Sequence, residues 1–500
     1  MKERSRFVVE QESGWYAMAE LCRIFGISRE TGYKWVERYE AGGPPGRRPG
    51  TNDRNRRLPR MFKEHAKGGS MSLSGARRTR REFLRTTAAV VAAPYVLTST
   101  ALGAAGRPPA SERIGVGCIG VGDMGGGHVG VAGRTRDVQL IAVCDVRKDR
   151  CDQLAKQHRC AAYNDFRDLL ARDDIDAVMV ATPDHWHALI TVEAAKAGKD
   201  IFSQKPFAYS VAEGRAMVEA VRRYNRVFQH GTQQRSGRRY RHACELVLNG
   251  RLGKVHTLRV GDPVGLSGGS TQPAPVPEGF DYDQWLGPAP WAPFTKDRCF
   301  GGIGGAGGLC WYHIQDYCAG WITAWGSHDV DIAQWGNGTD HTGPVEIEGR
   351  GEFARDGLYD TAQTWHVECR YANGVRLIYT TANEQPHGNR FEGTEGWVFV
   401  NRGKIEADPP SLLKEKFGPD EIRLYESNDH FGNFFECVRT RRETVAPPEA
   451  GHRSTTICHL AHLAVKLGRP LKWDPEKEKI LGDDEANRWL DRPKREPWRI

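Results

Sequence analysis

The 500-residue chain is long enough for two to four domains, and its composition is polar without being typical of disorder. Its net charge of +8 is concentrated near the N-terminus, where residues 1–70 carry 15 Lys and Arg against nine Asp and Glu, and residues 71–105 carry five Arg against one Glu. Residues 106–500 are left with a net charge of −2, which argues against a polyanionic partner, nucleic acid included, for the main body.

Residues 14–40 have the pattern of two short helices joined by a tight turn. Apolar residues recur at helical spacing on both sides of Gly26, and Ser28 stands where an N-cap is expected. The segment resembles the N-terminal DNA-binding domain of insertion-sequence transposases. We interpret residues 1–66 as a helix-turn-helix-like leader, either a remnant or a region upstream of a true start near Met71. The alternative is a DNA-binding regulator that acts through residues 14–40.

Residues 71–105 have the pattern of a twin-arginine export signal. Thr-Arg-Arg-Glu-Phe-Leu-Arg at 79–85 is followed by an Ala-rich apolar run that ends in small residues near Ala105. Pro94 and several hydroxyl residues interrupt the run, so a membrane-spanning helix is not expected. If translation begins near Met71, the sequence predicts a periplasmic protein.

A dinucleotide-binding turn follows the first strand of the main body. Ile114–Ile119 reads as a buried strand, and a second strand, Val138–Cys144, ends at Asp145. The glycines permit a tight turn that seats a pyrophosphate on a helix N-terminus, and Asp145 is placed to accept from a ribose hydroxyl. This carboxylate favours NAD, whereas Arg147 leaves NADP open. The turn residues expected to bind the cofactor are Gly120, Gly122, Asp123, Met124 and Gly125.

Two further turns stand at the carboxyl ends of predicted strands, where ligands of parallel sheets bind. Residues 175–181 form a strand that ends at Thr182-Pro183, and residues 200–203 form another that ends at Gln204-Lys205-Pro206. Thr182, Pro183, His187, Gln204 and Lys205 are therefore expected at the cofactor.

From these motifs the chain closely resembles the Gfo/Idh/MocA oxidoreductase family over about residues 112–500. Further matches lie at residues 231–235 and 325–331. The resemblance implies an α/β protein with an N-terminal Rossmann domain at 112–236. It also implies a C-terminal α/β domain at 237–500, built on a large open, mostly antiparallel sheet. Strand patterns that suit this second domain lie at 254–260, 364–371, 375–381 and 397–401.

The resemblance also implies the chemical roles. Lys205 and His328 are expected to exchange the proton of a substrate hydroxyl, and Asp331 to orient His328 or the substrate. A bound nicotinamide would disfavour the charged form of Lys205. The residues expected at the substrate are Gln234, Arg235 and Trp325.

The sequence departs from the family pattern at two positions. Gln204 replaces the usual Glu before Lys-Pro, and Ala324 replaces the usual Asp four residues before the His. The loss at Ala324 puts the customary proton relay in doubt.

The leading hypothesis is an NAD(P)-dependent oxidoreductase that acts on a hydroxyl of a sugar, polyol or sugar derivative. The alternative is an exported, NAD-dependent glycosidase that oxidises and re-reduces its substrate during hydrolysis. No metal is expected, because His185 and His187 have no evident third ligand and no Cys pair has C-x-x-C spacing. A homo-oligomer is left open.

Overall fold

The computed structural model describes residues 107–299 and 311–500. The predicted helix-turn-helix and export signal lie outside these residues. All the features below belong to the unit that spans Thr98–Ile500.

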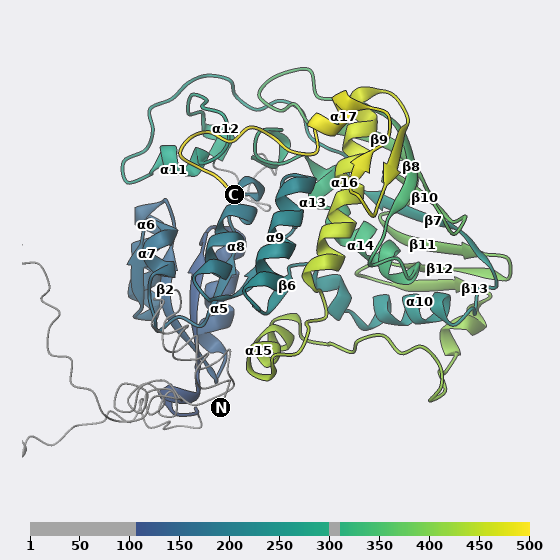
Figure 1. Cartoon of the computed structure of the whole chain (residues 1–500), viewed down its shortest axis with the longest axis horizontal. Coiled ribbons are helices and arrows are strands. Elements are labelled where there is room, and N and C mark those ends of the chain that lie inside the picture. The colour runs from purple at the N-terminus through teal and green to yellow at the C-terminus, as the bar shows by residue number, and fades with distance from the viewer. Residues whose placement is uncertain (1–106, 300–310) are drawn as a thin grey trace, which may run out of the picture. The chain divides into compact units, whose positions relative to one another are not determined.

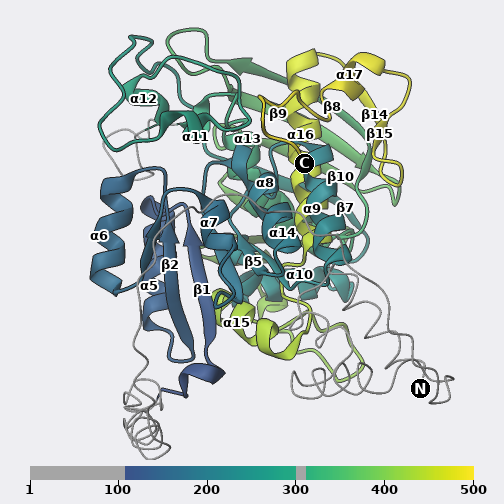
Figure 2. The ribbon, with the colours of Figure 1, turned by 60° about the vertical axis from the view of Figure 1, so that its left-hand side comes forward.

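The first domain is built on six parallel strands in the order β3-β2-β1-β4-β5-β6 (Figures 1 and 2). Its central strands form because they are continuous runs of apolar residues, buried on both faces. The parallel six-stranded sheet confirms the predicted Rossmann domain. Its elements are β1 (Ile114–Ile119), α5 (Asp123–Arg134), β2 (Val138–Cys144), α6 (Lys148–His158), β3 (Ala161–Tyr163), α7 (Phe166–Leu170), β4 (Ala177–Val180), α8 (His187–Lys196), β5 (Asp200–Ser203), α9 (Val211–Arg223) and β6 (Phe228–His230).

Helices cover both faces of this sheet (Figure 2). Side chains of α5 and α6 pack in one apolar cluster, and those of α7, α8 and α9 pack in another. The first cluster also contains Phe434 and Phe435 of α15 (His430–Thr440). This helix was assigned by sequence to the domain that begins at residue 237, yet it completes the Rossmann core.

The second domain is built on nine strands in the order β13-β12-β11-β7-β10-β9-β8-β14-β15. All its pairings are antiparallel except that of β10 with β7, so the predicted sheet type is confirmed. The strands are β7 (Val255–Asp262), β8 (Pro344–Phe353), β9 (Ala362–Tyr371), β10 (Arg376–Thr381), β11 (Gly388–Gly393), β12 (Gly396–Val400), β13 (Ile405–Asp408), β14 (Leu471–Asp474) and β15 (Lys479–Ile480).

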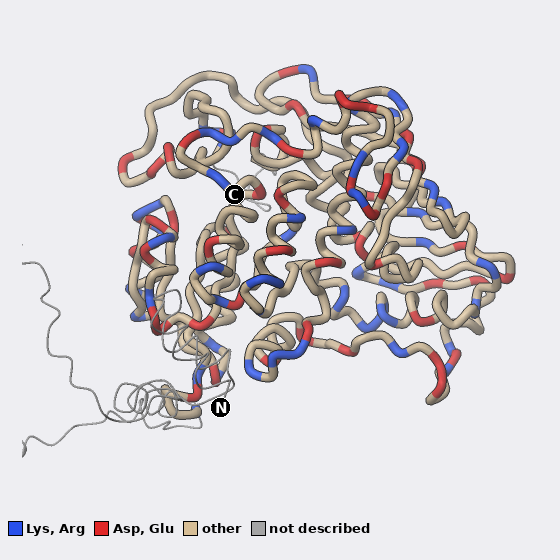
Figure 3. Tube along the Cα trace, viewed as in Figure 1, with Lys and Arg blue, Asp and Glu red and all other residues tan. Residues whose placement is uncertain are grey.

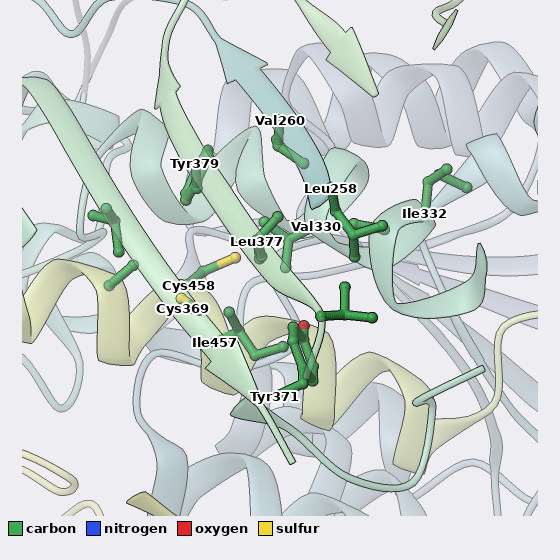
Figure 4. Close-up of a cluster of buried hydrophobic side chains, with 14 of the residues drawn as sticks. Leu258, Val260, Val330, Ile332, Cys369, Tyr371, Leu377, Tyr379, Ile457 and Cys458 are labelled. Atoms are coloured by element: carbon green, nitrogen blue, oxygen red, sulfur yellow. The ribbon is translucent and has the colours of Figure 1, made fainter. Parts of the chain in front are cut away.

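One face of this sheet packs on helices to form the largest apolar cluster of the described residues. Figure 4 shows Leu377 of β10 and Leu258 of β7 against side chains of α14 and α16. The helices that follow β6 are α10 (Arg238–Leu248), α11 (Tyr282–Leu286), α12 (Lys296–Cys299), α13 (Trp321–Ala324), α14 (Gly326–Gly336), α15, α16 (Pro448–Leu467) and α17 (Asp484–Arg488). Short 3-10 helices lie along the whole described chain, at Ala110–Glu112, Asp184–Trp186, Gln233–Ser236, Trp311–His313 and Pro410–Lys414.

Charges of both signs alternate along the described chain (Figure 3), as the net charge of the main body leads one to expect. Across residues 107–299 and 311–500, no helix combines the length and apolarity needed to cross a membrane.

Leu377 offers a test of the second core, because its side chain is fully buried between sheet and helices. Leu377→Ala should lower the free energy of unfolding by about 2 to 5 kcal/mol, since the substitution leaves a cavity. Denaturant midpoints would measure the loss. The matched control is Arg376→Ala, which removes an exposed side chain with one 3.9 Å ion pair and should change little. Equal effects of the two substitutions would contradict the assigned core.

Candidate active site

A cavity of about 400 Å³ opens at the carboxyl ends of the Rossmann strands. Residues of the second domain, among them Trp285 and Tyr312, also line it. Of the twelve predicted cofactor residues, the following ten line it: Gly120, Gly122, Asp123, Met124, Asp145, Arg147, Thr182, Pro183, Gln204 and Lys205.

The glycine turn has the shape that a pyrophosphate needs. Gly120 has φ +76°, and a Cβ there would lie 2.8 Å from the Ala181 backbone. A Cβ at Gly125 would lie 1.8 Å from the Gly120 carbonyl oxygen, so only glycine lets α5 approach β1 this closely. A Cβ at Gly122, in contrast, would meet no atom within 4 Å. Gly122 is also the N-cap of α5 and provides no side-chain cap, so the helix N-terminus remains suited to an anion.

Asp145 connects this turn to the end of β2. Its Oδ2 accepts from the Val121 amide at 2.7 Å and its Oδ1 from the Arg147 amide at 2.8 Å. Burial raises the pKa of Asp145, and these two amides oppose the rise. The carboxylate is therefore fixed in orientation at the cavity wall, as ribose recognition requires.

Arg150 is a wall residue that the sequence analysis missed. Its Nε donates to the Val121 carbonyl at 2.8 Å and its Nη2 to the Gly122 carbonyl at 3.2 Å. The sequence feature that could have identified Arg150 is its position in the first turn of the helix that follows Asp145. Arg147, in turn, pairs with Asp149 at 2.9 Å.

At the other end of the cavity, Gln204 is fixed by two contacts. Its side-chain amide lies 3.0 Å from His128 Nε2, and its Oε1 accepts from the Lys205 amide at 3.3 Å. The ammonium of Lys205 lies 5.1 Å from the centre of the Tyr312 ring. Gln204 thus holds the start of the Lys205-Pro206 turn.

His328 does not line the cavity, but it lies near enough to Lys205 for the ammonium to influence its pKa. Burial lowers the pKa of His328 well below its ordinary value, and the charge of Lys205 is the next cause. The imidazole is therefore neutral at pH 7. Its Nδ1 is buried and has no hydrogen-bond partner among the described residues, so it can accept a proton from a ligand.

The structure places His187 differently from the prediction. It does not line the cavity; it is buried with Nδ1 2.7 Å from the Pro206 carbonyl and Nε2 2.9 Å from the Thr182 carbonyl. Burial lowers its pKa to about 4, so the ring is neutral and donates to one carbonyl at a time. This geometry assigns His187 a positioning role that braces both strand-end turns.

Asp331 and Arg235 were predicted to contact substrate or base, but they bind each other. Arg235 donates to the two Asp331 oxygens at 2.7 and 2.9 Å, and to Asp340 at 2.9 and 2.8 Å. The pair is almost completely buried. Because its oxygens are already engaged, Asp331 is suited to holding α14 in place rather than to exchanging protons.

The other two predicted substrate residues flank the site. Gln234 lines a second, wider cavity of about 1440 Å³, which shares Met124 with the first. Trp325 lies between His328 and His387, with ring centroids 5.9 and 4.9 Å away, and the Arg402 guanidinium lies 5.0 Å from its ring.

Ala324, where the family has Asp, packs in a small apolar cluster with Tyr312 and Cys318. A carboxyl that the sequence analysis missed, Asp184, lies beside Cys318 and is 1% exposed. Burial raises its pKa to about 7, against the opposing effects of the Cys318 thiol and Lys205. The sequence feature that could have identified Asp184 is its position directly after the Thr182-Pro183 turn.

This elevated pKa predicts a pH dependence of stability. The folded state keeps the Asp184 proton up to about pH 7, whereas the unfolded state loses it near the ordinary pKa of an Asp side chain, 3.8. Raising the pH between these values therefore favours unfolding, by up to about 4 kcal/mol in total. Relative to Asp184→Asn, the wild-type chain should lose stability as pH rises from 4 to 7.

Denaturant midpoints of both proteins across this range would measure the difference. The control is Asp174→Asn, because Asp174 is paired with Arg172 and its pKa is lowered. The difference in denaturant midpoint between Asp174→Asn and wild type should stay constant above pH 5. If the difference between Asp184→Asn and wild type also stayed constant from pH 4 to 7, the raised pKa assigned to Asp184 would be refuted.

Comparison with known proteins supports the architecture. Residues 114–232 match the family described as "Oxidoreductase family, NAD-binding Rossmann fold", and residues 263–500 match "Oxidoreductase family, C-terminal alpha/beta domain". Residues 10–58 match a helix-turn-helix domain.

The chain is 25% identical to the uncharacterized oxidoreductase YrbE of Bacillus subtilis, over 72% of this chain and 97% of that protein. It is 37% identical to a glycosyl hydrolase family 109 protein of Shewanella baltica, over only 29% of this chain and 37% of that protein. The WlbA dehydrogenase of Bordetella pertussis, solved in complex with NADH and UDP-GlcNAcA, has a similar fold, with a TM-score of 0.54 and 17% identity over 72% of this chain and 99% of that one. The two matched halves together span the Rossmann domain and the sheet domain, and the chain therefore belongs to the Gfo/Idh/MocA oxidoreductase family.

Proposed function

We propose that the chain is an NAD-dependent dehydrogenase that oxidises a secondary hydroxyl of a sugar, polyol or sugar derivative. The observation that carries the proposal is a cavity lined by the glycine turn, Asp145 and Lys205, with a neutral, buried His328 near enough to Lys205 for the ammonium to lower its pKa. Oxidation of a carbinol needs a hydride acceptor and a group that takes the hydroxyl proton. The glycine turn and Asp145 suit the first need, and His328 suits the second.

Bound NAD⁺ would accept the hydride from the carbinol carbon. His328 Nδ1 would take the hydroxyl proton, since the ring is neutral and this atom lacks a partner among the described residues. The Lys205 ammonium would stabilise the alkoxide that forms before hydride transfer. Gln204 and His187 keep Lys205 in place by holding its turn.

Unsatisfied buried polar atoms around His328 favour a polyhydroxyl substrate. In the described chain, both ring nitrogens of His230 and Oε1 of Gln234 are buried without a hydrogen-bond partner. His230 is close enough to His328 to influence its pKa. Buried polar groups in proteins are normally paired, and Gln234 lines the second cavity, so these atoms favour ligand hydroxyls as partners.

A second candidate is a glycosidase in which oxidation of a ring hydroxyl acidifies the neighbouring C–H, allows loss of the aglycone, and is reversed after water adds. The similarity to a glycosyl hydrolase family 109 protein favours it. Such a route uses the same Lys205 and His328 and consumes no free NAD, so the two candidates differ in product rather than in site.

The N-terminal segments carry separate proposals. The match at residues 10–58 supports a DNA-binding role, which retention on duplex DNA at low salt, lost steeply as salt rises, would test. Export to the periplasm through residues 71–105 stays a prediction.

Substitution of the two central residues tests the site. Lys205→Ala and His328→Ala should each lower kcat by about 10²- to 10⁴-fold, because each removes a group that acts on the reacting hydroxyl. NADH formation with a panel of sugars and polyols would report dehydrogenation, and release of nitrophenol from aryl glycosides would report hydrolysis. Lys196→Ala is the matched control, because Lys196 is exposed and pairs with Glu193. Full activity of both site variants on every active substrate would exclude this site.

The pH profile provides an independent test. Since burial and the charge of Lys205 lower the pKa of His328, it stays unprotonated through the range where an ordinary histidine titrates. The plateau of kcat/KM should therefore extend below pH 6.5 on the acid side. An acid limb centred at or above pH 6.5 would contradict His328 as the base.

A further inference from the structure

Three side chains of metal-ligand type converge where β7, α14 and β11 meet. Asp262 ends β7, Asp329 lies in α14, and His387 directly precedes β11. His387 Nε2 lies 3.2 Å from Asp329 Oδ2 and 3.7 Å from Asp262 Oδ1. One ligand atom from each residue lies within 4.8 Å of the other two. The three come from positions far apart in sequence, so no motif announces the cluster.

The remaining carboxylate oxygens are held by donors from outside the cluster. Tyr379 Oη donates to Asp262 Oδ2 at 2.7 Å, and the Asn389 amide donates to Asp329 Oδ1 at 2.9 Å. The other oxygen of each carboxyl is thereby turned toward His387. This is the arrangement of metal sites, in which partners behind the ligands fix their orientation.

Asp262 also provides an unsatisfied atom. Its side chain is fully buried, and its Oδ1 has no hydrogen-bond partner among the described residues. This is the oxygen that faces His387 Nε2. A buried carboxylate oxygen without a donor is costly, so the site calls for a positive group at this point.

The charges lead to the same conclusion. Asp262 is fully buried and Asp329 is 1% exposed, so the two carboxyl groups are held close together away from water. A cation between them would offset the cost of burying negative charge.

We propose that Asp262, Asp329 and His387 bind a divalent transition-metal cation of the Zn²⁺ or Mn²⁺ type. Ligands bonded at about 2.1 Å to one such ion lie about 3.0 to 3.5 Å from each other, close to the observed spacings. The imidazole favours these ions over Mg²⁺, which prefers oxygen ligands alone. His387 is partly exposed, which leaves a path for the ion to enter.

The cation would tie α14 to the sheet beside the active site. Asp329 follows His328 in α14, and the Trp325 ring lies near both His328 and His387. The site thus lies on the sheet side of the helix that carries the proposed base. Its existence does not depend on the proposed dehydrogenase activity.

Metal binding to the full-length chain tests the proposal. The chain is stripped with a chelator and titrated with Mn²⁺, and the free ion is followed by electron paramagnetic resonance. We expect about one Mn²⁺ per chain at this site, displaced by Zn²⁺. Asp329→Asn and His387→Ala should each weaken binding by at least about tenfold, and Asn389→Ala by about tenfold, because Asn389 orients Asp329.

His366→Ala is the matched control. His366 lies on the same sheet with Glu384 at 2.6 Å and Glu368 at 3.5 Å, but these carboxylates are half-exposed. Its substitution should leave Mn²⁺ affinity unchanged, and circular dichroism would verify that every variant is folded. Failure of the chain to bind either ion, or binding that survives both Asp329→Asn and His387→Ala, would overturn the proposal and leave a proton as the partner of the carboxyl pair.

Discussion

The buried ion pair between Arg235 and Asp331 is the contact on which the geometry of the active site depends. Arg235 follows β6, the last strand of the Rossmann sheet, and Asp331 lies in α14, so the pair joins the two domains. With Asp340 on its other side, the guanidinium has two carboxylate partners. Replacing such a pair by apolar residues need not weaken a fold, but removing one member leaves a buried charge unpaired. The ion pair therefore contributes to the relative placement of the two domains rather than to net stability, and it fixes the position of His328 relative to Lys205.

That placement also sets the electrostatics of the reaction. His328, His230 and His430 are buried near Lys205 or Arg235, and burial keeps each imidazole neutral, with nearby positive charge as a further cause. Neutral imidazoles accept protons and bind hydroxyls, whereas imidazolium ions would repel a nicotinamide cation. In the proposed reaction the positive charge of Lys205 would favour an anionic alkoxide, which is the species that hydride transfer requires. The protonation state of each buried imidazole is therefore set by its surroundings rather than by its residue type alone.

Local sequence signals predicted much of this architecture. The glycine turn, the strand-end turns and the burial of both faces of the parallel strands are short-range patterns, and the structure has them at the expected residues. The sequence could not predict contacts that are set by tertiary packing. Three such contacts are the pairing of Asp331 with Arg235, the contacts of His187 with two strand-end turns, and the packing of α15 on the Rossmann core. Each joins segments that are far apart in the sequence, and no periodic pattern relates those segments. A side chain's residue type indicated its possible chemistry, but only its neighbours decided its role.

Position 324, where the family has a carboxyl, shows how residue type and tertiary neighbours together decide a role. Ala324 lies in an apolar cluster, so a carboxyl there would have been buried beside Cys318. The structure instead has Asp184 next to the same thiol, with its pKa raised to about 7. A buried carboxyl of this kind can take up or release a proton near neutrality, which an ionised surface carboxylate could not do as readily. Position 324 thus carries no carboxyl, and the buried carboxyl beside Cys318 comes instead from the turn that follows β4.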